Sequence, residues 1–109
     1  MKVNEIIDKL HLERVSDAGN TESDVSGCFA CDLLSLAMSS VEKGNIWITV
    51  QTNVNILAIA SLTEASCIIV ANSMSISDAV IDKAKEEKIC LLRSDNGVYE
   101  LCNMIGDII

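Results

Sequence analysis

Two cysteines three positions apart, Cys28 and Cys31 in the stretch SGCFACDLLS, are the residues whose spacing first raises the question of chemistry. A CxxC pair at a helix start can act as a redox dithiol, and with further ligands it can hold zinc. Here both cysteines precede Asp32, which we expect to cap the next helix. The pair therefore falls on a strand, where side chains three apart point to opposite faces. We predict neither a disulfide nor a metal at this pair.

The other residues capable of metal or nucleophilic chemistry are scattered along the chain. His11 is the only histidine, Cys67 and Cys90 each begin an apolar stretch, and Cys102 falls on the apolar side of a predicted helix. A buried cysteine that packs as a small hydrophobic residue accounts for all three cysteines. The sequence contains no phosphate loop, dinucleotide fingerprint, nucleophile elbow or zinc-protease motif. We predict no catalytic residue, no metal and no cofactor, and therefore a protein that is not an enzyme.

Composition narrows the classes of partner. The chain has 109 residues, half of them apolar, which is enough for one domain over residues 1–109. Its net charge of -8 argues against nucleic acid and against an anionic membrane surface, since both require lysine and arginine. No apolar run reaches the roughly 18 residues of a membrane span, and the first residues carry charges throughout. These features predict a cytoplasmic location.

Hydrophobic periodicity predicts alternating helices and strands. Helices are expected over Met1–Leu12, Leu33–Lys43 with Gly44 as the residue that ends it, Val54–Ala65 capped by Asn53, Ser77–Lys88, and from about Val98 onward. Strands are expected near Val15 and over Gly27–Cys31, Asn45–Gln51, Ser66–Ala71 and Ile89–Leu92. A polar loop joins the first two strands. Alternation of this kind predicts an α/β, three-layer αβα domain with a mainly parallel sheet.

Polar residues follow three of the predicted parallel strands. Ligands in such sheets bind beyond the carboxyl ends of the strands, next to helix N-termini that favour anions. Because the net charge is strongly negative, we expect a weakly anionic or neutral polar ligand there. The candidate ligand-binding residues are Thr52, Asn53, Asn72, Ser73, Arg93 and Ser94.

Two stretches, CDLLSLAMSSVEKGNIWITVQTNVNILAIASLTEASCIIVANS and AKEEKICLLRSDNGVYEL, resemble the DRTGG domain. That domain is similar to the N-terminal domain of HPr kinase/phosphorylase and also occurs between the CBS modules of some pyrophosphatases. The most specific matches are DLLS at Asp32–Ser35 and the G-x-x-W-I-T pattern at Gly44–Thr49. The residues that give the family its name are replaced here by QTNVN at 51–55 and ANS at 71–73.

The resemblance implies an α/β regulatory or assembly domain that is often dimeric and has no established reaction of its own. We therefore predict a non-enzymatic regulatory or ligand-sensing domain that acts as a homodimer. A second feature also predicts a homodimer: the apolar arc over residues 33–38 is too wide for a helix that buries one side only. Two other interpretations stay open. One is a small thiol-based redox or metal-binding protein that uses Cys28 and Cys31. The other is a protein-interaction adaptor without a small ligand.

Overall fold

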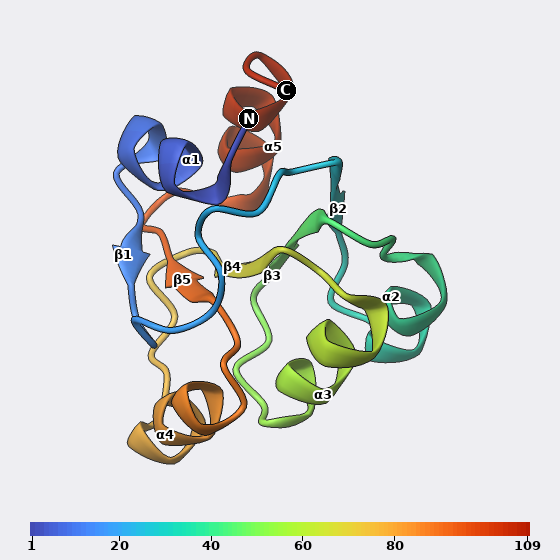
Figure 1. Ribbon diagram of the computed structural model, residues 1–109, viewed down its shortest axis with the longest axis vertical. Coiled ribbons are helices and arrows are strands. Elements are labelled where there is room, and N and C mark those ends of the chain that lie inside the picture. The colour runs from blue at the N-terminus through green and yellow to red at the C-terminus, as the bar shows by residue number, and fades with distance from the viewer.

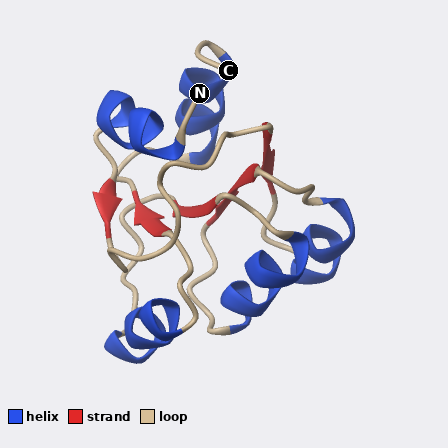
Figure 2. Ribbon diagram, viewed as in Figure 1, coloured by secondary structure: helices blue, strands red, loops and turns tan.

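The computed structural model describes the whole chain, Met1–Ile109. Its helices are α1 (Val3–Leu10), α2 (Leu34–Ser40), α3 (Asn55–Thr63), α4 (Asp78–Glu86) and α5 (Val98–Gly106). Its strands are β1 (Glu13–Arg14), β2 (Gly27–Ala30), β3 (Asn45–Thr49), β4 (Cys67–Val70) and β5 (Leu91–Arg93). The strands form one sheet in the order β1-β5-β4-β3-β2, parallel except for β1. The predicted α/β fold with a mainly parallel sheet is confirmed (Figures 1 and 2).

The helices lie in two layers, one on each face of the sheet (Figure 1). From β2 to β5 each new strand is added on the same side of the previous one. Crossovers between parallel strands are almost always right-handed, so helices α2, α3 and α4 must all fall on one face. Helices α1 and α5, which connect no parallel strands, cover the other face. None of the helices is both long and apolar enough to cross a membrane.

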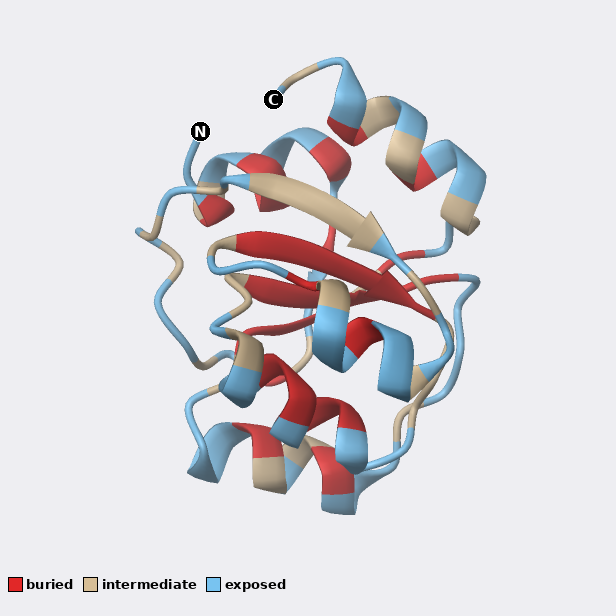
Figure 3. Ribbon diagram, turned by 90° about the vertical axis from the view of Figure 1, so that its right-hand side faces the viewer, coloured by how far each residue is buried: buried red, intermediate tan, exposed pale blue.

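Alternation along the strands divides the core into two apolar clusters. In β3, Ile46 and Ile48 pack toward α1 and α5, while Trp47 packs toward α2, α3 and α4. All five residues of β3 are buried, as expected for a central parallel strand covered on both faces. The edge strand β2 is only half-buried, which Figure 3 shows beside the buried central strands.

The strand register decides which loops lie together. Thr49 pairs with Val70, and Val70 pairs with Arg93. The last residues of β3, β4 and β5 are therefore level, and the loops that follow them leave the sheet at one end, which we call the carboxyl end. The loops that enter these strands gather at the opposite end, which we call the amino end.

The start of α2 differs from the prediction. Asp32 is not its N-cap: the cap position is Leu33, which makes no side-chain cap hydrogen bond. The Asp32 carboxylate instead accepts hydrogen bonds from Thr49 Oγ1 at 2.9 Å and from the Val50 amide at 2.8 Å. Two hydrogen bonds to a charged acceptor, each worth about 1.5–3 kcal/mol, outweigh the roughly 0.5–2 kcal/mol that a helix cap contributes.

The end of α2 also differs. The helix was expected to reach Lys43, with Gly44 ending it, but it stops at Ser40 because Val41 takes an extended backbone and becomes buried. Gly44, with φ 83°, instead shapes the turn into β3. A Cβ at Gly44 would lie 2.8 Å from Ser26 Oγ, so the loop before β2 requires glycine at this position.

Candidate functional site

The loops after β4 and β5 are joined by hydrogen bonds at the carboxyl end. The amide of Asn72 donates to the Asn96 carbonyl, and the amide of Ser73 donates to the Ser94 carbonyl, each at 2.9 Å. Ser73 Oγ donates to Asp95 Oδ1 at 2.6 Å. Three of the predicted ligand-binding residues, Asn72, Ser73 and Ser94, are therefore brought together, although much of their hydrogen-bonding capacity is already used.

The loop after β3 carries Thr52 and Asn53. It lies beside the loop after β4 because β3 and β4 are neighbours. Asn53 is not the N-cap that the sequence predicts: the cap position of α3 is Val54, which makes no side-chain cap hydrogen bond. Asn53 Oδ1 instead accepts from the Asn55 amide at 2.8 Å, two residues on, in the turn that precedes α3. Gln51 Nε2 donates to the backbone carbonyl of Asp32 at 3.1 Å, which ties this loop toward α2.

Arg93 is the single positive charge among the predicted site residues. Its Nε lies 3.4 Å from a carboxylate oxygen of Glu13 on the antiparallel strand β1, and its side chain is 31% exposed. The guanidinium therefore has a carboxylate partner at the sheet edge. Any anion at the carboxyl end competes with Glu13 for this cation.

Helices α3, α4 and α5 all start at the carboxyl end, so their N-terminal amides give this end a partial positive charge. The electrostatics suit a weak anion. However, the structure contains two cavities, and none of the six predicted residues lines either of them. The predicted site is an open polar surface and not a pocket.

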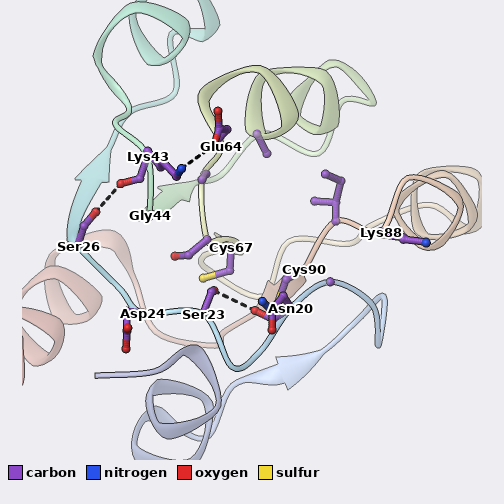
Figure 4. Close-up of a pocket in the computed structure, with 15 residues that line it drawn as sticks. Asn20, Ser23, Asp24, Ser26, Lys43, Gly44, Glu64, Cys67, Lys88 and Cys90 are labelled. Atoms are coloured by element: carbon purple, nitrogen blue, oxygen red, sulfur yellow. Dashed lines mark hydrogen bonds and ion pairs between the residues drawn. The ribbon is translucent and has the colours of Figure 1, made fainter.

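The larger cavity, about 500 Å³, lies at the amino end and is partly open to solvent (Figure 4). Its floor comprises Ser66 and Cys67 at the start of β4 and Cys90 before β5. The C-terminal ends of α3 and α4 form one side, and the loop between β1 and β2 forms the other. The sequence prediction missed this cavity. A run of small residues, Ala65 to Cys67, opposite a long polar loop is the signal that could have revealed it.

Four of the five cysteines lie among apolar side chains: Cys67 and Cys90 in the core, and Cys28 and Cys102 packed against it. Cys28 packs toward the α5 layer, whereas Cys31 Sγ lies 3.3 Å from the carbonyl oxygen of Leu33. Burial, together with the neighbouring Cys102, raises the pKa of Cys28 to about 12, which keeps this thiol protonated and unreactive at neutral pH. All five cysteines are free, and no group of three or more His, Cys, Asp or Glu side chains is placed to hold a metal ion.

An apolar surface lies over α2. Leu33, Leu36 and Met38 are 63%, 46% and 51% exposed. The helix adjoins the uncharged edge strand β2, whose outer edge has no strand partner (Figure 3). We call these three side chains with the β2 edge the α2 face. Exposed apolar side chains and an open strand edge are each typical of a contact surface.

No family model matches the sequence, and no curated protein matches it. The fold is similar to a solved structure of the CBS and DRTGG domains of the regulatory region of Clostridium perfringens pyrophosphatase, which was determined in complex with its activator, diadenosine tetraphosphate. The TM-score is 0.70 at 16% sequence identity, over 95% of this chain and 45% of that one. The similarity supports a DRTGG-like fold. At this identity, and over less than half of the other chain, it shows the fold alone.

Proposed function

We propose that this chain is a regulatory, non-catalytic domain of the DRTGG family that senses a small ligand and acts as a homodimer in the cytoplasm. The observation that carries the proposal is the similarity of nearly the whole chain to a regulatory region that binds a small activator. The sequence resemblance to DRTGG domains at Asp32–Ser35 and Gly44–Thr49 supports the same family. The raised pKa of Cys28 argues against the thiol-based alternative.

The proposed ligand surface is the carboxyl end. Asn72 and Ser73 supply amide and hydroxyl groups, and Thr52 and Asn53 flank them at the start of α3. Ser94, which is 6% exposed, supports the neighbouring loop, since its Oγ accepts from the Asn96 amide at 3.0 Å. Arg93 supplies the positive charge once a ligand anion displaces Glu13. An open surface with one shared cation favours a weakly anionic group, such as a single phosphate, over a triphosphate.

A thermal-shift screen with phosphorylated metabolites and nucleotides tests the sensing role. A ligand present at 100 times its Kd adds about 2.7 kcal/mol to the free energy of unfolding, which is a measurable rise in Tm. A saturable rise with one phosphorylated compound is the expected result. The absence of a shift with every compound at millimolar concentration would refute ligand sensing at the carboxyl end.

The proposed dimer forms through the α2 face. We expect the wild-type chain to sediment as a dimer at tens of micromolar and the Leu36→Glu variant to sediment as a monomer. The matched control is Leu62→Glu on α3, because Leu62 is 70% exposed and lies outside the α2 face. A wild-type monomer, or equal dissociation of both variants, counts against this interface.

A further inference from the structure

We propose that the cavity at the amino end is a second binding site, for an uncharged polar ring compound of about nucleoside size. The cavity volume of about 500 Å³ falls within the range of roughly 300–1,000 Å³ usual for small-molecule sites. The site is separate from the proposed phosphate-binding surface at the other end of the sheet. A test of this site is therefore independent of a test of the proposed function.

One wall of the cavity is a loop anchored at both ends. At its start Ser16, which is 1% exposed, donates through Oγ to the Ile89 carbonyl at 2.8 Å and accepts from the Leu91 amide at 3.0 Å. At its end Ser26 Oγ donates to the Lys43 carbonyl at 2.7 Å. Anchors on both sides hold the wall in place before any ligand arrives, which reduces the ordering cost of binding.

The charges around the cavity favour an uncharged ligand. The charged residues that line it are two lysines and two acids, Lys43, Lys88, Asp24 and Glu64, so their formal charges cancel. Lys43 is also paired with Glu64 at 3.4 Å (Figure 4). Because α3 and α4 end here, their C-terminal carbonyls add partial negative charge. Lys88 makes no ion pair, but the equally unpaired Asp24 offsets its charge, so a phosphate would meet no net positive charge.

The floor of the cavity suits the face of a ring. Cys67 and Cys90 on the floor, with Ala60 and Ile89 on the helix side, supply the apolar part of the lining, and Ala60, Cys67 and Cys90 expose only 3%, 2% and 5% of their surface. A buried cysteine behaves as a small hydrophobic residue, which suits contact with the apolar face of a ring. Polar groups such as Asn20 and Ser23 line the loop side of the cavity. A flat polar molecule can therefore place one face on the floor and direct its hydrogen-bonding edge toward the loop.

The test is an amide NMR titration of the full chain with nucleosides, free bases and methyl glycosides, each nucleoside beside its own monophosphate. The two members of each pair share the same base and sugar and differ by the phosphate group, which adds negative charge. We expect at least one uncharged probe to cause saturable shifts at the amides of Gly44, Ser66 and Cys90. Its monophosphate should bind there about tenfold more weakly.

A variant that fills the cavity locates the binding. In Ser23→Trp the indole occupies the space beside the loop, and the shifts at the three amides should be lost. Ser75→Trp, at an exposed position that lines neither cavity, is the matched control and should bind as wild type does.

Three results would overturn the proposal. The first is that no probe causes saturable shifts at the amides of Gly44, Ser66 and Cys90. The second is that a monophosphate binds there as tightly as its nucleoside. The third is that the folded Ser23→Trp variant, checked by its own spectrum, binds as wild type does. Shifts caused by monophosphates at the carboxyl end bear on the proposed function and leave this site unaffected.

Discussion

The two ends of the parallel sheet differ in both space and charge. At the carboxyl end, side chains and backbone groups of neighbouring loops bond to one another, as Ser73 does to Asp95 and Asn72 to Asn96, and none of the six predicted site residues lines a cavity. At the amino end, a long loop passes opposite small residues and leaves about 500 Å³. Topology favours the carboxyl end for ligands. The comparison shows that topology sets the electrostatics of each end, whereas side-chain volume decides where there is room.

The largest effect is expected when the loop at the amino end is displaced. Gly19 has φ 85°, and a Cβ there would lie 2.6 Å from the backbone nitrogen of Cys90. We expect Gly19→Ala to lower the free energy of unfolding by about 2 kcal/mol or more, from strain and overlap together. Urea unfolding followed by circular dichroism measures it.

The matched substitution at the carboxyl end is Gly97→Ala. The nearest atom to its added Cβ is Glu100 Oε2, at the tip of a flexible side chain, and the backbone φ of -77° suits any residue. We expect a change within about 1 kcal/mol. Similar losses for both variants would show that the two ends do not differ in tightness.

Alkaline pH should lower the free energy of unfolding, because two buried thiols in the floor of the cavity, Cys67 and Cys90, lose their protons. Burial raises the pKa of Cys90 to about 11 and raises that of Cys67 well above its ordinary value. The unfolded chain releases these protons near pH 9, before the folded chain does, so the stabilisation is complete below pH 9 and is lost as pH rises toward 11. The slope approaches about 1.4 kcal/mol per pH unit for each such thiol.

Urea unfolding at a series of pH values above neutrality measures this slope. The Cys67→Ala variant, which lacks one of the buried thiols, should show a shallower dependence than wild type. A stability that is flat above pH 9, or an unchanged slope in the variant, would contradict the assignment.

At the carboxyl end, the shared guanidinium controls anion affinity. Arg93→Ala should weaken binding of a phosphorylated ligand about tenfold, the effect of losing one charge-assisted hydrogen bond. Glu13→Gln should strengthen binding, since it removes the carboxylate that lies 3.4 Å from Arg93. Calorimetric titration measures both affinities, and unchanged affinity in Arg93→Ala would remove this residue from the site.

The smallest expected effect is a change of ligand preference at the amino end. Glu64→Lys raises the summed charge of the lining residues from zero to +2 and releases Lys43 from its ion pair. We expect the preference for a nucleoside over its monophosphate to fall several-fold, and less at high salt because these charges are exposed. An unchanged preference would show that charge does not select the ligand here.

The sequence alone determined the order of helices and strands and the direction of the sheet. The apolar run of β3 and the amphipathic pattern of α4 depend only on local side-chain types, so the sequence shows them directly. The right-handedness of crossovers then places α2, α3 and α4 on one face of the sheet. Because parallel strands end level, the sequence also predicted that Asn72, Ser73 and Ser94 belong to neighbouring loops. The proximity of residues about 20 positions apart followed from topology.

Only the tertiary structure decided how individual polar groups are used. The sequence predicts Asp32 as a helix cap, but its carboxylate accepts hydrogen bonds from Thr49 and Val50, which are 17 and 18 positions away. The sequence predicts that Arg93 binds a ligand through its positive charge, but strand β1 places Glu13 beside it as an ion-pair partner. The amino-end cavity arises where segments distant in sequence fail to fill the space between them. Local pattern cannot report such partners or such volumes, because both depend on side chains that meet only once the chain has folded.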